Sequence, residues 1–377
     1  MNVAPIQRAA YFLKWAYGNG ASPGDGVKKK IGEQLRRWRA LGIKIRIFIS
    51  ARRECRAAWL TEVEPDELFV SVAATRLARF ASFKEIHRAV ETFAPDFLYI
   101  RQEVYSPQLG RLMERWPSFA ELNGDELAEV QLTGVRDACY WMYRAISRSA
   151  FFRRVIGLVA VSRELASARA FTRYDLPTVV IANGIDLSLF EPLPPPKANG
   201  LRFGFIGASL GARWHGASKI VDLARLRPDW QFDIIGLKAS EFDGPIPQNL
   251  TAHGVLDRAH YEPVLAECDV AFGSLSGYEK KAWEGSALKV RQYLAFGIPI
   301  VSGVRDTDFP DGADFLLLLP NTSDNVLGNV ERIEAFARRW KGRRVPRDQI
   351  THIDFGVKEA RRIDFVTRVL SGRPPSN

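Results

Sequence analysis

Hydrophobic and polar positions change their period several times along this chain, which predicts strands alternating with helices. Short apolar runs such as Ala9–Trp15 and Phe97–Arg101 (FLYIR) are typical of strands that are buried on both faces. Between such runs, apolar residues recur every three or four positions, as in Val27–Leu41, which is typical of helices with one buried face. This alternation favours parallel sheets covered by helices, and we expect an α/β fold.

The length of the chain and a proline-rich segment predict two domains. A chain of 377 residues is too long for one ordinary core. The clearest linker contains four prolines, at positions 192, 194, 195 and 196, and Gly200. We therefore expect an N-terminal domain over residues 1–190, a linker over 191–200 and a C-terminal domain over 201–354. The tail, residues 355–377, contains an amphipathic helix pattern.

The composition is that of a globular protein, with 46% apolar and 25% charged residues. No apolar run reaches the roughly 18 residues of a membrane-spanning helix, and the N-terminus lacks a signal-peptide core. Cys55, Cys139 and Cys268 lie far apart and show neither metal spacing nor a disulfide framework. We expect a soluble protein of a reducing compartment, and hence a cytoplasmic one.

Positive charge is concentrated near the N-terminus. The net charge is +10, and residues 1–50 contain ten Lys or Arg against Asp25 and Glu33. Such a patch suits an anionic partner, either a membrane surface, a pyrophosphate-linked acceptor or a nucleic acid. A solvated helix face that keeps the protein soluble explains the same charges.

The most informative stretch runs from Glu284 to Gly303 (EGSALKVRQYLAFGIPIVSG). It predicts an acidic residue in a loop of small residues, then a helix with Ser286 as its N-cap. A glycine stop at Gly297 and a buried strand complete it. Gln292 lies two turns after Glu284, so that one bound molecule could contact both side chains.

The start of this helix has the properties of an anion site. Its first backbone N–H groups lack partners inside the helix and point outward with the positive end of the helix dipole. They belong to Ala287, Leu288 and Lys289. Such an end suits a phosphate group. An ordinary helix-strand unit with a surface glutamate would show the same pattern.

This stretch resembles the donor-binding motif of the retaining glycosyltransferases of family 4, which have the GT-B fold. In that family a first glutamate holds sugar hydroxyls, a second one holds the ribose, and the helix start carries the diphosphate. Glu284 matches the first glutamate, whereas Gln292 stands in place of the second and carries no charge. The residues that follow match the motif's tail, namely Ala295, Gly297, Pro299, Ile300 and Val301.

Further segments carry the same resemblance. The family ends its first domain with a strand and an N-G-i-D turn, which Asn183–Asp186 matches in an architectural role. The segment FAELNGD is similar to a loop that faces acceptor and transferred sugar, so we place Glu121, Asn123 and Asp125 nearest the reacting carbon. A polar turn is the plain alternative, because Asn-Gly-Asp is turn chemistry by itself.

The resemblance also suggests the remaining phosphate contacts. Gly24 and Gly26 match a first loop whose glycines contact the donor diphosphate. In the second domain the family has an arginine and a lysine that hold the diphosphate. Here His215 occupies the lysine's place, and Arg213 or Lys289 is the substitute for the arginine.

The resemblance implies two doubly wound, Rossmann-like domains facing across a cleft, with the last helix crossing back to the first domain. It implies hexosyl transfer from a UDP- or GDP-sugar to a glycan or lipid-linked acceptor with retention of configuration, as in bacterial polysaccharide or cell-envelope glycan synthesis. We expect no cofactor, no nucleic-acid partner and no metal, because a triplet such as Asp306–Asp308 arises by chance. The basic first helix would face the inner surface of the cytoplasmic membrane.

Two other functions remain open at this point. One is a nucleotide-sugar 2-epimerase of the same fold. The other is a non-catalytic, transferase-like binding protein, which the departures at His215 and Gln292 would explain.

Overall fold

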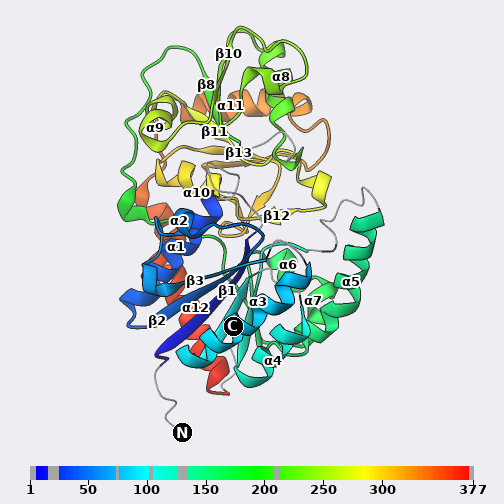
Figure 1. Cartoon of the computed structure of the whole chain (residues 1–377). Coiled ribbons are helices and arrows are strands. Elements are labelled where there is room, and N and C mark those ends of the chain that lie inside the picture. The colour runs from blue at the N-terminus through cyan, green and yellow to red at the C-terminus, as the bar shows by residue number, and fades with distance from the viewer. Residues whose placement is uncertain are drawn as a thin grey trace. The chain divides into compact units, whose positions relative to one another are not determined.

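The computed structural model describes residues 6–15, 25–73, 76–101, 105–125, 127, 135–207 and 213–372. The chain forms two compact units: unit 1 comprises Met1–Ile181 and Phe355–Asn377, and unit 2 comprises Ala182–Asp354 (Figure 1). Among the described helices, none combines the length and the hydropathy that crossing a bilayer requires.

Unit 1 is built on a parallel sheet of seven described strands in the order β3-β2-β1-β4-β5-β6-β7. Its strands are β1 (Arg8–Trp15), β2 (Lys44–Ala51), β3 (Leu68–Val72), β4 (Phe97–Arg101), β5 (Ser118–Leu122), β6 (Gly157–Ala160) and β7 (Thr178–Val180). Its helices are α1 (Asp25–Ala40), α2 (Arg56–Trp59), α3 (Arg76–Phe93), α4 (Pro107–Arg115), α5 (Val135–Phe152), α6 (Arg163–Ser167), α7 (Arg169–Thr172) and α12 (Phe355–Leu370).

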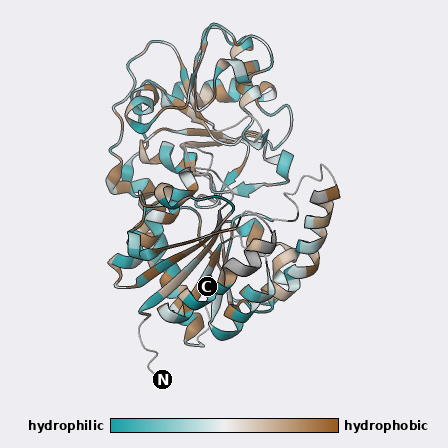
Figure 2. Cartoon of the chain, in the orientation of Figure 1, coloured by the Kyte–Doolittle hydropathy of each residue, from teal (hydrophilic) through white to brown (hydrophobic). Residues whose placement is uncertain are grey.

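Helices cover both faces of this sheet. On one face Trp38 of α1 and Phe365 of α12 are buried in the same core as alternate strand residues such as Tyr11. On the other face Phe83 of α3 and Phe152 of α5 are buried in a second core. Hydrophobic residues predominate in the strands, whereas the helices are mixed (Figure 2). Two-sided burial explains why runs such as FLYIR lack polar alternation.

Unit 2 repeats this plan with six described parallel strands in the order β10-β9-β8-β11-β13-β15. They are β8 (Arg202–Ile206), β9 (Gln231–Ile235), β10 (Leu250–Gly254), β11 (Val270–Phe272), β13 (Ile300–Ser302) and β15 (Leu316–Leu318), and β12 (Glu284–Gly285) pairs separately with β14 (Arg305–Asp306). The helices are α8 (Ala217–Leu226), α9 (Arg258–Ala266), α10 (Leu288–Ala295) and α11 (Val330–Trp340).

The strand order identifies where a ligand would bind in each unit. In each sheet the strands that follow the first one are added on one side of it, and the later strands are added on its other side. The order therefore reverses between β1 and β4 in unit 1 and between β8 and β11 in unit 2. In doubly wound sheets ligands bind outside the carboxyl ends of the strands at this switch point. The prediction of two doubly wound α/β domains is confirmed, and α12 belongs to unit 1 as expected.

The segment before β8 differs from the prediction. Residues 182–200 were expected to close the first domain and to form a linker, but they pack within unit 2. The Phe190 ring lies 5.1 Å from that of Phe296, and the buried Leu193 donates its N–H to the Phe296 carbonyl at 3.0 Å. Arg344 donates to the carbonyl of Pro194 at 3.0 Å. Apolar contacts and the partly buried Arg344 therefore hold this proline-rich segment, which its composition alone does not reveal.

Candidate active site

The first backbone N–H groups of α10 are not hydrogen-bonded within the described part of the protein. Among the described residues, no acceptor lies within hydrogen-bonding distance of the Leu288 and Lys289 N–H groups. The N-cap is Ala287, which has no side chain that could cap the helix. Two backbone donors and the helix dipole therefore remain available to a ligand.

Ser286 does not cap the helix, so that prediction is wrong. Its hydroxyl accepts the Asn183 N–H at 2.8 Å and an N–H of Arg291 at 2.9 Å. The Ser286 carbonyl accepts the Asn183 side-chain amide at 2.6 Å. The hydroxyl is thus used to join the Asn183 turn to the loop before α10, and it is not free for the helix N-terminus.

A buried arginine fixes this loop. Arg291 is fully buried and donates to the Asn183 carbonyl at 2.7 Å and to both carboxylate oxygens of Asp306 at 2.9 Å. Asp308 lies 3.0 Å from the same guanidinium. The two aspartates of the Asp306–Asp308 triplet, whose spacing resembles that of metal ligands, therefore pair with an arginine side chain. No group of three or more metal-ligating side chains is found among the described residues.

Glu284 lies in a short strand and not in the expected loop. It pairs through β12 with Arg305 of β14, and the Gly285 carbonyl accepts the Thr307 N–H at 3.1 Å. Its side chain is half-buried. This pairing fixes the backbone of Glu284, which lies three residues before the N-cap of α10.

Lys289 is buried beside the open helix start without a hydrogen-bond partner. Its Nζ is enclosed, contacts no acceptor among the described residues and lies 3.9 Å from the centre of the Phe205 ring. Burial lowers the pKa of Lys289 well below its ordinary value. A buried amine without an acceptor costs free energy, so an anionic ligand would both satisfy it and raise its pKa.

His215 adds a neutral group to the same site. Its Nδ1 lies 3.3 Å from the Ser274 hydroxyl, just past the end of β11. Burial, assisted by the charges of Lys289 and Lys280, lowers the pKa of His215 to about 2. His215 is therefore neutral at physiological pH and offers a hydrogen bond without charge. Its position after β8 and beside the end of β11 is the switch point of unit 2.

The other two residues predicted in unit 2 are less enclosed. Gln292 is half-buried and donates its amide to the Tyr261 hydroxyl at 3.0 Å, which leaves its carbonyl oxygen as an acceptor. Arg213 is exposed in the turn that carries His215. The structure thus gathers Ala287, Leu288, Lys289 and His215 closely and places Gln292 one turn further along α10.

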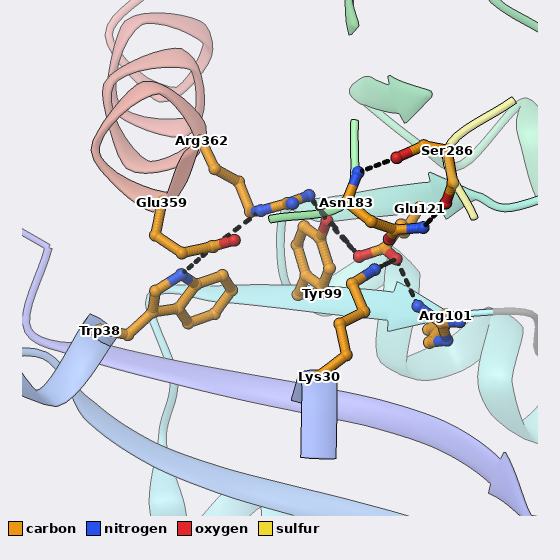
Figure 3. A network of polar contacts seen from close by, with 9 residues as sticks. All are labelled: Lys30, Trp38, Tyr99, Arg101, Glu121, Asn183, Ser286, Glu359 and Arg362. Atoms are coloured by element: carbon orange, nitrogen blue, oxygen red, sulfur yellow. Dashed lines mark hydrogen bonds and ion pairs between the residues drawn. The ribbon is translucent and has the colours of Figure 1, made fainter. Parts of the chain in front are cut away.

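In unit 1, Glu121 occupies a different place from the one predicted. Its buried carboxylate accepts from Lys30 at 2.6 Å, from Arg101 at 2.5 Å and from Tyr99 at 2.8 Å (Figure 3). Arg362 lies 3.5 Å away and also donates to Tyr99. Both oxygens are occupied, and the side chain is fully buried. This geometry suits an anchor that joins α1, β4 and α12, and it argues against direct contact with a sugar.

The charges in this cluster are strongly coupled. Burial alone would raise the pKa of Glu121, but Lys30, Arg101 and Arg362 hold it well below its usual range. Burial lowers the pKa of Lys30 to about 8, although Glu121 opposes the change. The cluster continues on α12, where Glu359 accepts from Arg362 and from Trp38, each at 2.8 Å.

The remaining residues predicted in unit 1 differ in their burial and hydrogen bonding. Asn123 follows β5, is half-buried and has an amide nitrogen without a hydrogen-bond partner among the described residues. Asp125 accepts from Arg148 and from the Leu127 N–H, each at 3.1 Å. Gly26 is exposed in the first turn of α1. Gly24 lies outside the described residues.

Sequence reasoning missed the residues that hold the site together. Arg101, the last residue of β4, was missed; it is paired in register with Glu121, the second-last residue of β5. A charge near the end of each of two neighbouring apolar strands was a usable signal for this pair. Arg291 had no such signal, because an arginine within a helix is ordinary until its burial is known.

Comparisons with known proteins identify the fold. Neither a protein-family model nor a curated protein sequence matches the chain. Solved structures do. The apo form of the lipopolysaccharide outer core galactosyltransferase WaaB is 15% identical, with a TM-score of 0.64 over 97% of this chain and 99% of its own. Anabaena HepE in complex with UDP and glucose is 12% identical, with a TM-score of 0.57 over 96% and 99%.

A third similar structure has another activity. A Listeria monocytogenes protein assigned as a UDP-N-acetylglucosamine 2-epimerase is 12% identical, with a TM-score of 0.56 over 100% of this chain and 99% of its own. At such identities the likeness defines the fold and not the reaction. The chain has the GT-B fold, as its sequence predicts.

Proposed function

We propose that this chain is a retaining glycosyltransferase that moves a hexosyl group from a UDP- or GDP-sugar to a glycan or lipid-linked acceptor. The observation that carries the proposal is the buried amine of Lys289, which has no hydrogen-bond partner among the described residues, beside the start of α10. Backbone donors, a helix dipole and a desolvated amine at one switch point match a diphosphate. UDP in the similar HepE structure supports this choice of ligand.

Each residue of the site then has a role. The Leu288 and Lys289 N–H groups and the Lys289 amine bind the diphosphate, with His215 as a neutral donor and Arg213 at the exposed edge. Glu284 accepts hydrogen bonds from hydroxyls of the sugar. The Gln292 carbonyl oxygen, oriented by Tyr261, accepts one from the ribose.

Transfer follows from these contacts. The bond between the anomeric carbon and the diphosphate breaks, and the electron pair leaves with the nucleoside diphosphate. A new bond forms to the acceptor oxygen, whose proton is released. Positive charge develops on the sugar, as in glycoside cleavage, while negative charge collects on the leaving group. Lys289 and the α10 donors stabilise that negative charge in a buried setting, where such contacts are strongest.

We assign the acceptor to unit 1 and place the reaction at the inner face of the cytoplasmic membrane, in polysaccharide or cell-envelope glycan synthesis. Asn123, whose amide nitrogen has no partner among the described residues, is one acceptor-side candidate, and Gly26 remains a candidate for contact with the donor diphosphate. Asp125, held by Arg148, is the other acceptor-side candidate. Glu121 stabilises the same end of the sheet through its buried ion pair with Lys30.

Donor hydrolysis and nucleotide binding test the proposal. We expect slow hydrolysis of a UDP- or GDP-sugar that Glu284→Ala abolishes while UDP or GDP still raises the unfolding temperature. Arg305→Ala, a substitution of the exposed residue paired with Glu284, is the matched control and should leave hydrolysis intact. If none of UDP, GDP and ADP shifts the unfolding temperature, the assignment of the α10 start is wrong.

An epimerase is the second candidate, favoured by the full-length likeness to the Listeria protein. Incubation of a UDP-N-acetylhexosamine without acceptor separates the two reactions. Epimerised sugar nucleotide identifies an epimerase, whereas free UDP and sugar identify a transferase. Binding of UDP with neither product would identify a non-catalytic binding protein.

A further inference from the structure

Helix α5 of unit 1 carries an apolar stripe on its outer side. Val135, Cys139, Met142 and Ile146 are spaced by four, three and four residues, which places them on one face of the helix. All four are exposed, Val135 by 81% and Ile146 by 74%. An amphipathic helix of a globular protein normally turns such a stripe toward the core.

The opposite face of α5 is the one that packs on unit 1. Phe151 and Phe152 at its end are buried in the core. Arg148 is also buried, with its guanidinium 4.7 Å from the centre of the Phe171 ring and bonded to Asp125. The helix therefore has two apolar faces, and only one of them is covered by the described chain.

Two aromatic residues of α5 are also exposed: Tyr143 lies beside the outer stripe, whereas Trp141 lies two turns before Arg148 on the opposite face. Trp141 and Tyr143 are both exposed, yet their polar atoms are already bonded to the protein. The Trp141 indole N–H donates to the Leu127 carbonyl at 3.2 Å, and the Tyr143 hydroxyl donates to the Tyr105 carbonyl at 2.6 Å. What these side chains present outward is therefore hydrocarbon, which suits an apolar medium better than a polar protein surface.

The surroundings of the stripe are basic. Residues 135–175 contain eight arginines against three acidic residues. The four exposed described arginines of this segment are Arg153, Arg163, Arg169 and Arg173. Helices α5 and α7 are in contact, since the rings of Phe152 and Phe171 lie 5.5 Å apart. An apolar helix face within such a basic segment matches an anionic lipid surface, whereas two copies of the segment would bring like charges together.

Helix α1, in which the sequence shows the highest basic charge, is less suited to this role. Lys30 is buried against Glu121. Arg36 and Arg37 are paired with Glu33, and Arg39 is paired with Glu67. Much of the charge that predicted a membrane surface at α1 is thus neutralised inside unit 1.

We propose that the outer face of α5 docks on an anionic lipid bilayer, with Val135, Met142, Ile146 and the ring of Tyr143 inserted among the headgroups. The helix would lie parallel to the membrane, to a depth of about 5–10 Å. The inference deepens the membrane location in the proposed function, but it is independent of the donor chemistry in unit 2.

The chain offers its own probe for this contact. Cys139 lies on the stripe and is exposed, whereas Cys55 and Cys268 are buried. An environment-sensitive fluorophore on Cys139 should shift to the blue with phosphatidylglycerol vesicles and not with phosphatidylcholine vesicles. High salt should weaken the shift, because the arginine contribution is screened. Unlabelled protein should co-sediment with the same vesicles.

A paired substitution and a matched control test the surface. Met142→Glu with Ile146→Glu should weaken binding to phosphatidylglycerol vesicles by about tenfold or more, because two apolar contacts become like-charged with the lipid. Val255→Glu changes a similarly exposed residue of unit 2, 69% exposed, and should bind as the unaltered chain does. The UDP-induced thermal shift should be the same in all three proteins, which shows that they are folded.

Three results would overturn the proposal. One is vesicle binding by the double variant equal to that of the unaltered chain. Another is no vesicle binding by the unaltered chain while the UDP-induced shift is present. The third is a dimer in sedimentation equilibrium that the double variant dissociates, which would identify a second copy as the occupant of the α5 face.

Discussion

Replacement of Lys289 by methionine should change the stability of the unliganded protein and its affinity for nucleotide in opposite directions. Methionine keeps the length of the side chain and removes the amine. In the unaltered chain this amine is buried and has no hydrogen-bond partner among the described residues. An unsatisfied buried polar group costs about 1–3 kcal/mol, so its removal should stabilise the unliganded protein. The variant should still pack against the Phe205 ring, because a methionine sulfur makes favourable contacts with aromatic rings.

The effect on the nucleotide should have the opposite sign. A hydrogen bond to a charged group is worth about 1.5–3 kcal/mol, so UDP or GDP should bind about 10- to 150-fold more weakly to Lys289→Met. For a domain of this size, each kcal/mol gained without ligand raises the unfolding midpoint by about 2–4 °C. Lys289→Met should therefore unfold at a higher temperature alone and gain less from added nucleotide.

Thermal unfolding with and without nucleotide, together with titration calorimetry, measures both changes. Calorimetry in buffers of different ionisation enthalpy adds a third reading. Because burial lowers the pKa of free Lys289 and a bound diphosphate would raise it, nucleotide binding should take up protons at pH values between the two, and Lys289→Met should lose this uptake. Lys29→Met, at an exposed lysine of α1, is the control. Unchanged nucleotide affinity, or a less stable unliganded variant, would refute the reasoning.

Three further predictions concern the buried charges. Glu121→Gln should lower the free energy of unfolding, measured in urea, by about 3–5 kcal/mol, because three cations lose their carboxylate partner. A variant of normal stability that has lost turnover would instead support the catalytic role predicted from sequence. Arg291→Met should also lower the free energy of unfolding by about 3–5 kcal/mol, since Asp306 and Asp308 lose their partner. It should weaken UDP binding as well, because the loop before α10 loosens. Intact UDP binding in a destabilised protein would contradict the predicted effect on binding. Burial lowers the pKa of Lys30 from 10.5 to about 8, so the unfolded chain binds more protons between these values. The stability of the unaltered chain relative to Lys30→Met should therefore rise with pH across that window, by about 3 kcal/mol at most, and a falling difference would show the opposite shift.

The chain's periodicity was sufficient for the architecture. Strands buried on both faces appear as apolar runs, and the helices between them repeat every three or four residues, so the α/β class and most strands could be predicted. The unpaired N–H groups at the start of α10 could also be predicted, because they are a local property of the backbone at a helix start.

The domain boundary and the cap of α10 could not be predicted locally. The proline-rich segment looked free, but Leu193 and Phe190 pack on Phe296, more than a hundred residues later. Ser286 is a good N-cap by residue type, yet its hydroxyl bonds to Asn183 and Arg291. In both cases a distant partner overrides the local preference, and no short segment contains that partner.

The sequence by itself determined the secondary structure, the doubly wound class and the position of the helix that we propose binds the donor, because each depends on neighbours in the chain. Only the tertiary structure decided that Glu121 is a buried anchor, that Arg291 occupies the acidic triplet and that the Lys289 amine is left without an acceptor. Charge and burial at these residues depend on groups brought together from distant segments, and desolvation acts only once the chain has packed around them.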